Sequence, residues 1–168
     1  MEDKKLKFNW IKEIVPYLII ILIVLFVKRY VVTTVVVHGD SMLPTLHDKD
    51  IMVLNEIGIR FSSIKRYDIV VIKTDKTKII KRVIGLPGEV VEYFDGNLYI
   101  NGEIIEDPYN NGNTNDFKEV KLGDDEYFVL GDNRSNSADS RIIGPIDKSD
   151  ILGRATFTIF PFNRLGKK

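Results

Sequence analysis

Two dipeptides, Asp95-Gly96 and Asn101-Gly102, place the strongest constraint on what this 168-residue chain can fold into. Asp-Gly and Asn-Gly favour the positive backbone angles of two-residue hairpin turns. Apolar or aromatic residues flank both dipeptides, so residues 90–94, 97–100 and 103–105 are predicted to form a three-stranded meander. A chain that reverses twice over so short a distance requires an antiparallel sheet.

Other runs rich in β-branched and apolar residues predict further strands, whereas little outside the N-terminal region has helical periodicity. These strands are expected at residues 30–37, 51–54, 68–73, 78–84, 127–130 and 155–160. Residues 106–125 are rich in Asn, Asp and Gly and are expected to form a surface loop. The predicted fold class is therefore mainly β, with antiparallel sheets folded over each other into a distorted barrel or sandwich, preceded by one N-terminal transmembrane helix.

The transmembrane prediction rests on residues 14–27, an apolar run without a charge. As a helix this run is about 21 Å long, and flanking apolar residues can extend it toward the roughly 30 Å of a bilayer core. A cleavable secretory signal would need a small-residue cleavage site, but bulky and charged residues follow the run. A buried helix of a soluble protein would need a polar stripe, which the run lacks.

The distribution of basic residues predicts the orientation of this anchor. Four lysines precede the apolar run, and only Lys28 and Arg29 follow it closely. Basic residues favour the cytoplasmic side of a membrane. We therefore expect a short cytoplasmic N-terminus at residues 1–13, a transmembrane anchor at residues 14–31 and an extracytoplasmic β-rich catalytic domain at residues 32–168.

Composition argues against several classes of function. The 24 basic and 24 acidic residues balance, which gives no overall reason to expect nucleic-acid binding. Cysteine is absent, so disulfides, thiol nucleophiles and cysteine-ligated metals are excluded. The two histidines have no acidic partners at zinc-site spacing. We expect no cofactor, no metal and no nucleic-acid partner.

Three motifs carry the chemistry. Ser41 lies in GDSMLPTL (residues 39–46), Lys81 in IIKRVIGLPGE (residues 79–89), and a polar run, GDNRSNSADSR, occupies residues 131–141. A serine attacks an acyl group only when a base takes its proton, and a lysine of depressed pKa can replace histidine as that base. The apolar strand around Lys81 suggests the required desolvation. The backbone N–H of Ser41 is a candidate oxyanion donor.

The two histidines suggest a different mechanism. His38 and His47 flank Ser41, and Asp132 or Asp139 could complete a conventional triad. His38 is only three residues from Ser41, which makes the hydroxyl awkward to reach, and His47 lies in a polar loop. We expect both histidines to be exposed or packing residues.

In this order, behind an apolar segment, the three motifs resemble those of the bacterial type I signal peptidases, in particular the Gram-positive branch. The resemblance covers nearly the whole chain. It implies a β fold and a membrane-bound serine endopeptidase that removes N-terminal signal peptides from exported preproteins after Ala-x-Ala sites. Ser41 would be the nucleophile and Lys81 the general base. The expected partners are preproteins and the lipid bilayer, and the protein is expected to be a monomer in the bacterial cell membrane.

The resemblance also implies roles for other residues. Ser137 would hydrogen-bond Lys81, and Asp139 and Arg141 would form an ion pair beneath the site. Some members of the family have a serine at the position of Gly39, whose hydroxyl is a second oxyanion donor, so that donor is absent here. The substrate would bind extended along strand edges near residues 37–39 and 79–81. The candidate pocket walls are Val35, Val37, Met42, Leu46 and Ile80.

Two other functions fit parts of the sequence. The repressors of the bacterial SOS response share the Ser/Lys pair but are soluble and cut themselves, and this chain has an apolar segment and no DNA-binding module. A membrane-tethered β module that binds exported peptides without cleaving them is the non-catalytic alternative. Self-cleavage as the main reaction, or binding without turnover, would distinguish these two from the peptidase.

Overall fold

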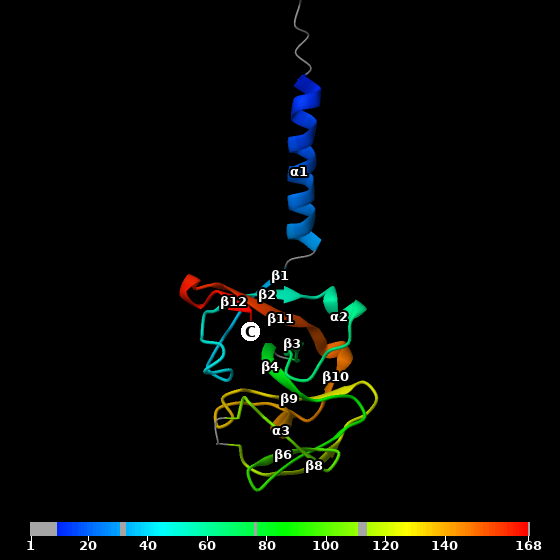
Figure 1. Ribbon diagram of the computed structural model, residues 1–168, viewed down its shortest axis with the longest axis vertical. Helices are drawn as coiled ribbons and strands as arrows, with labels where there is room; N and C mark the ends of the chain where they lie inside the picture. Colours follow the sequence, from blue (N-terminus) through cyan, green and yellow to red (C-terminus); the bar gives the residue numbers. More distant parts are fainter. Residues whose placement is uncertain (1–9, 31–32, 76, 111–113, 168) are drawn as a thin grey trace, which may run out of the picture. The chain divides into compact units, whose positions relative to one another are not determined.

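The computed structural model describes residues 10–30, 33–75, 77–110 and 114–167, and the chain divides into two compact units (Figure 1). The first unit, residues 1–33, contains the helix α1 (Trp10–Tyr30). The second unit, residues 34–168, contains the sheets and the three chemical motifs. The candidate site is therefore built within one unit.

The helix α1 has 21 residues, with Pro16 inside it, and its side chains from Ile14 to Val24 are uncharged and exposed. Among the residues that the structure describes, no helix is both long and apolar enough to cross a membrane. The transmembrane anchor predicted for residues 14–31 is not confirmed and stays a prediction. Residues 1–9 of the predicted cytoplasmic segment lie outside the described residues, as do residues 31 and 32.

The larger sheet of the second unit has eight strands in the order β1-β2-β11-β3-β4-β9-β10, with β12 paired to β11. The pairs that join β2, β3, β4, β9, β10, β11 and β12 are antiparallel. The strands are β1 (Thr33–Val36), β2 (Ile51–Asn55), β3 (Ile69–Lys73), β4 (Lys78–Gly85), β9 (Glu126–Leu130), β10 (Ile146–Asp147), β11 (Ile151–Phe160) and β12 (Gly166–Lys167).

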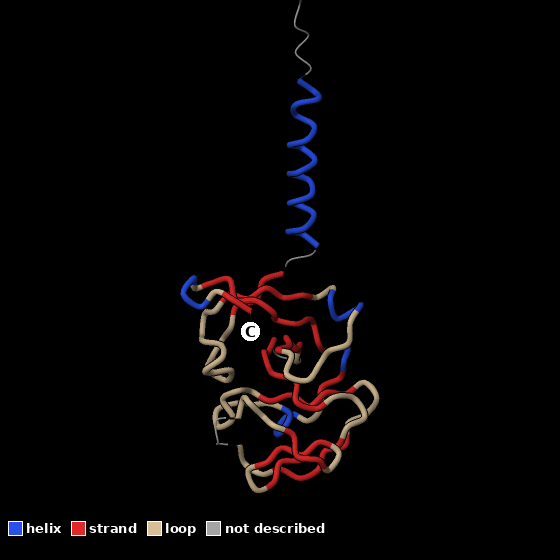
Figure 2. The backbone as a smooth tube through the Cα atoms, in the orientation of Figure 1, coloured by secondary structure: helices blue, strands red, loops and turns tan. Residues whose placement is uncertain are grey.

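A second sheet of four antiparallel strands has the order β7-β6-β5-β8 (Figure 2). Its strands are β5 (Val90–Phe94), β6 (Asn97–Ile100), β7 (Glu103–Ile105) and β8 (Phe117–Lys121). The two predicted turns are present, and Asp95 and Asn101 both have positive φ. The remaining elements are single helical turns: α2 (Gly58–Phe61), α3 (Ser140–Ile143), η1 (Lys148–Asp150) and η2 (Phe162–Arg164).

The mainly β prediction is confirmed, with two corrections. The larger sheet is not closed into a barrel, because its order ends at β1 and β10, which do not pair with each other. The loop predicted at residues 106–125 contains the strand β8, which pairs with β5. Phe117 and Val120 of β8 pack against the core. The two residues between them are charged, so the composition of this segment predicted a loop and not a strand.

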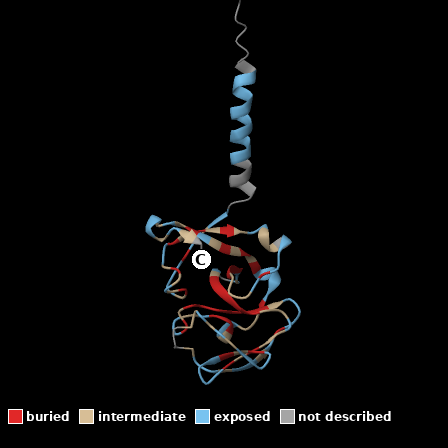
Figure 3. Ribbon diagram, viewed as in Figure 1, coloured by how far each residue is buried: buried red, intermediate tan, exposed pale blue. Residues whose placement is uncertain are grey.

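The strand β4 lies at the centre of the fold and carries the candidate base. Residues 80–85 of β4 are all buried, as Figure 3 shows for this strand. β3 pairs along its own full length with residues 78–82 of β4, with Val70 opposite Lys81. On the other side, β9 pairs only from Arg82 to Gly85. Residues 78–81 therefore have a strand neighbour on one side only, among the described strands.

Candidate active site

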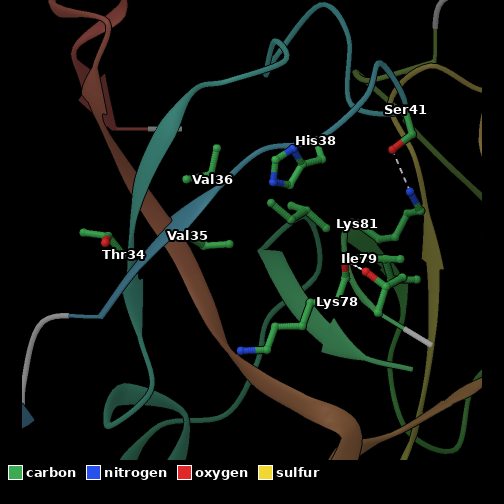
Figure 4. Close-up of a pocket in the computed structure, with 10 residues that line it drawn as sticks. Thr34, Val35, Val36, His38, Ser41, Lys78, Ile79 and Lys81 are labelled. Carbon is green, nitrogen blue, oxygen red and sulfur yellow. Dashed lines mark hydrogen bonds between the residues drawn. The ribbon is translucent and has the colours of Figure 1, made fainter. Parts of the chain in front are cut away.

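Ser41 and Lys81 are in direct contact. The Lys81 Nζ lies 2.7 Å from Ser41 Oγ and forms a hydrogen bond with it, although the residues are 40 positions apart (Figure 4). Lys81 is 4% exposed and Ser41 is half-buried. The contact places a hydroxyl and an amine at a distance that allows proton transfer between them.

The surroundings of Lys81 favour its neutral form. Burial lowers the pKa of the Lys81 amine, and the positive charge of Arg141 adds to this effect. The carboxylates of Asp139 and Asp132 act in the opposite direction, but the pKa remains below its ordinary value of 10.5. Loss of hydration destabilises the charged form of a buried amine more than the neutral form. Desolvation therefore determines the direction of the pKa shift of Lys81.

The turn that carries Ser41 is anchored on both sides. The backbone N–H of Leu46 donates to the carbonyl of Met42 at 2.9 Å, and both side chains are at most 1% exposed in the core. From the other side, the backbone N–H of Asn133 donates to the Ser41 carbonyl at 3.0 Å. Buried packing and a long-range hydrogen bond together hold the nucleophile in place.

The segment after β9 supports the site through an ion pair. Arg141 Nε donates to Asp139 Oδ1 at 2.8 Å, so the pair expected from the sequence is present. Burial raises the pKa of Asp139, but the hydrogen bonds from Arg141 and from the backbone N–H of Gly131 outweigh it and hold the pKa below its usual value. Asp139 is therefore a stable carboxylate within range of Lys81.

Ser137 does not make the predicted hydrogen bond to Lys81. Its Oγ is buried and makes no hydrogen bond of ordinary geometry among the described residues, although it lies close enough to Asp139 to help lower the pKa of that carboxyl. The Ser137 hydroxyl instead packs against Gly131, where an added Cβ would lie 2.3 Å from it. The Lys81 amine instead donates to Ser41, and Ser137 is not among the residues that line the cavity beside this pair.

Sequence reasoning missed a buried ion pair next to the candidate base. Arg82 donates from Nε to Asp132 Oδ1 at 2.8 Å and from Nη2 to Oδ2 at 2.6 Å, and the two side chains are 2% and 1% exposed. The guanidinium lies 3.4 Å from the centroid of the Tyr109 ring. The signal in the sequence was a second basic residue inside an apolar strand, since burying it requires a partner.

The histidine-based triad is not assembled. His38 is exposed and lines the same cavity as Ser41. The Ser41 hydroxyl, however, is hydrogen-bonded to Lys81. His47 is half-buried, and its backbone N–H donates to Asp50. The two candidate aspartates bind Arg82 and Arg141 instead, so neither is placed to orient a histidine.

A cavity of about 550 Å³ opens beside the Ser41–Lys81 pair. Of the predicted wall residues, Val35 and Ile80 line it. Val37, Met42 and Leu46 do not, because their side chains pack in the core with at most 2% exposure. The lining residues are Thr34, Val35, Val36, His38, Ser41, Thr77, Lys78, Ile79, Ile80 and Lys81.

Comparisons with known proteins agree with this geometry. Residues 7–160 match the family model described as signal peptidase, peptidase S26. Signal peptidase I S of Bacillus subtilis is 39% identical, over 99% of this chain and 96% of that protein. Signal peptidase I of Bacillus amyloliquefaciens is 38% identical, over 98% and 94%.

A solved structure is also similar. The crystal structure of a signal peptidase I from Enterococcus faecalis superposes with a TM-score of 0.52 at 34% identity, covering 56% of this chain and 98% of that one. The match over nearly the whole sequence, together with the contact between a serine and a buried lysine, leads to one assignment. The chain belongs to the signal peptidase family, peptidase S26, whose members are serine peptidases that are membrane-associated in bacteria.

Proposed function

We propose that this protein removes signal peptides from exported preproteins after small-x-small sites, with Ser41 as nucleophile and Lys81 as general base. The observation that carries the proposal is the 2.7 Å contact between Ser41 Oγ and a lysine amine that is 4% exposed. A surface lysine would be charged at neutral pH and could not accept a proton. Burial lowers the pKa of Lys81 and so favours the neutral amine that can accept one.

In the acylation step, neutral Lys81 accepts the hydroxyl proton as Ser41 Oγ bonds to the scissile carbonyl carbon. The carbonyl electron pair moves to oxygen, and the Ser41 backbone N–H donates to the resulting oxyanion. Collapse breaks the C–N bond, and the Lys81 ammonium protonates the leaving amine. Lys81 then takes a proton from water, which attacks the ester, and the proton returns to Ser41 Oγ as the acid product leaves.

The cavity fits an extended peptide with small side chains. It lies between β1 and residues 78–81 of β4, where no described strand occupies the second edge. An extended substrate can pair with such an edge through its backbone. Val35 and Ile80 are β-branched walls close to the nucleophile. Small residues fit between such walls, whereas bulky ones clash.

The supporting residues hold this arrangement without touching the reacting atoms. Arg141 Nη2 donates to the carbonyl of Arg134 at 2.7 Å and to Asp139 at 2.8 Å, so the ion pair fixes the segment that covers the site. Ser137 packs against Gly131, the residue that precedes the Asp132–Arg82 ion pair. Gly39 has φ +79° and no hydroxyl, which leaves the Ser41 backbone N–H as the protein's proposed oxyanion donor.

Cleavage of a preprotein with an Ala-x-Ala junction tests the substrate class. The detergent-solubilised wild type should cut after the P1 alanine, and replacing that alanine by leucine should reduce the rate at least about 10-fold, because a pocket rejects added bulk by clash. Ser41→Ala is the control that assigns the cutting to this site. Equal cleavage of both junctions would contradict the specificity. Self-cleavage as the main product, or binding of the preprotein without turnover, would support the two alternative functions.

We also propose that the N-terminal segment attaches the protein, as a monomer, to the bacterial cell membrane, with residues 1–13 in the cytoplasm and the catalytic unit outside. The support is the apolar, exposed surface of α1 from Ile14 to Val24 and the excess of lysine before it. The protein should stay with membranes after alkaline extraction, and external protease should digest the catalytic unit in intact spheroplasts. Release by alkali would contradict the anchor, and protection from protease would contradict the orientation.

A further inference from the structure

Asn133 makes hydrogen bonds to the carbonyls on both sides of the nucleophile. Its backbone N–H donates to the Ser41 carbonyl at 3.0 Å, and its side-chain Nδ2 donates to the Asp40 carbonyl at 3.0 Å. The Asn133 Oδ1 accepts from Ser135 Oγ at 3.2 Å. Both ends of the amide are engaged, which determines which end faces Asp40.

The bond to Asp40 acts on Ser41 through the geometry of the peptide unit. The Asp40 carbonyl and the Ser41 N–H belong to one planar group and, in a trans peptide, point in opposite directions. Fixing the carbonyl therefore fixes the direction of the N–H. That N–H is the proposed oxyanion donor, and a donor stabilises the transition state only when it is aimed at the developing charge beforehand.

Side-chain packing does not restrain the backbone at Gly39, just before this peptide unit. Gly39 has φ +79°, and a Cβ placed on it would meet no atom within 4 Å, so no side chain packs there. Its backbone N–H donates to Asp48 Oδ1 at an exposed position. The Asp40 carbonyl accepts two hydrogen bonds, from the Leu43 backbone N–H at 3.2 Å and from Asn133 Nδ2 at 3.0 Å, so Asn133 supplies the one side-chain contact that opposes rotation of the following peptide plane, among the described residues.

Asn133 itself is tied to the strand that carries the base. Its neighbour Asp132 binds Arg82 in the buried ion pair, and Arg82 follows Lys81 in β4. The backbone N–H of Asn136 donates to the Asn133 carbonyl at 3.0 Å, which closes a turn behind it. The ion pair and the turn therefore connect the strand that carries Lys81 to the residue that orients the proposed oxyanion donor.

We infer that Asn133 is a positioning residue that holds the Ser41 peptide plane so that its N–H faces the oxyanion of the bound substrate. The inference rests on the proposed peptidase function. The Asn133 amide Nδ2 donates to the Asp40 carbonyl and not to a group of the Ser41–Lys81 pair. It acts through the Asp40 carbonyl.

Asn133→Ala should lower kcat about 10- to 100-fold with KM changed less than about 2-fold, a smaller loss than the roughly 10²- to 10³-fold for removing an oxyanion donor outright. Asn133→Asp should lose more, since a carboxylate cannot donate to Asp40 and adds negative charge near the oxyanion. Ser135→Ala is the matched control, because it removes only the exposed contact to Asn133 Oδ1, and its kcat should stay within about 2-fold of wild type.

The decisive readout is the affinity for a small-x-small peptide boronic acid, which forms a tetrahedral adduct with Ser41. In the variants this affinity should fall by the same factor as kcat/KM. The affinity of the uncleaved substrate peptide, measured in the Ser41→Ala background, should stay unchanged. A purely structural role would lower both affinities together, and that result, or an unchanged kcat, would overturn the inference.

Two further comparisons keep the outcomes distinct. Thermal unfolding of each variant shows whether it folds, and if Asn133→Ala does not, the near-isosteric Asn133→Asp supplies the same affinities for the test. If the wild type fails to cleave the Ala-x-Ala preprotein, the proposed function fails. If the wild type cleaves and depends on Ser41 while the Asn133 variants match it, only the positioning role fails.

Discussion

Replacing Lys81 by methionine should lower kcat/KM by about 10⁴-fold or more, the scale on which single members of a catalytic unit act. Methionine fills a similar volume without a basic nitrogen, so the Ser41 hydroxyl keeps its place and loses its proton acceptor. Lys81→Arg should fail as well, because a guanidinium does not deprotonate in proteins. Lys73→Met is the matched control, since Lys73 is an exposed lysine at the end of the neighbouring strand and should leave the rate unchanged.

Activity of Lys81→Arg comparable to wild type would contradict the lysine-base mechanism. It would return attention to His38, which lines the cavity together with Lys78. Progress curves with the Ala-x-Ala preprotein measure all four proteins under one set of conditions. The Ser41→Ala background value marks the floor of the assay.

The pH dependence supplies an independent signature of the same lysine. In wild type, kcat/KM should rise with pH as Lys81 loses its proton, with a midpoint below 10.5, because burial lowers the pKa of this amine. The unfolded chain binds this proton more tightly than the folded protein. Between the lowered pKa and 10.5, stability should therefore increase as pH rises, and below the lowered pKa the destabilisation is fully present.

Lys81→Met removes this dependence. The variant should be more stable than wild type at low pH, and the difference should shrink as pH rises through the window. Denaturant midpoints of the two proteins, measured at several pH values, test this. A difference that does not change with pH would show that Lys81 has the same pKa in the folded and unfolded states.

Local pattern was sufficient to predict most of the strands. Alternation and turn dipeptides depend on neighbours in sequence, and β4 to β7 follow them closely. The placement of Lys81 in an apolar strand was also visible locally. Its partner 40 positions away came from the motif resemblance, and the structure brings the two side chains into contact.

The walls of the cavity could not be predicted in the same way. Val37, Met42 and Leu46 are apolar residues near the nucleophile, and sequence does not show which of them face the core. Ser137 shows the same limit, since a hydroxyl in a polar run can face several neighbours. Asn133 could not be distinguished from an ordinary turn residue in the sequence. Its proposed role depends on the hydrogen bond from its side-chain amide to the Asp40 carbonyl, 93 positions away, which only the structure shows.

The buried pair Arg82–Asp132 should contribute the largest single effect on stability. Asp132→Ala leaves the Arg82 guanidinium in a site that is 2% exposed, without its carboxylate. Removing one partner of a buried ion pair costs about 3–5 kcal/mol, because the remaining charge stays desolvated. Urea unfolding should show this loss as a lower midpoint with an unchanged slope. Arg154→Met is the control: its pair with Asp68 is longer, at 3.3 Å, and more exposed, so the loss should be below about 1 kcal/mol.

The double variant Arg82→Met, Asp132→Leu separates the pair's net contribution from the cost of breaking it. Apolar side chains of similar size carry no desolvation cost, so the double variant should recover much of the stability that Asp132→Ala loses. Its kcat should nevertheless stay low, because Asp132 precedes Asn133 and the ion pair ties that residue to the strand of Lys81. A double variant that is as unstable as the single one would mean that the pair holds the fold itself. Recovery of both stability and kcat would mean that Asn133 keeps its place without the ion pair.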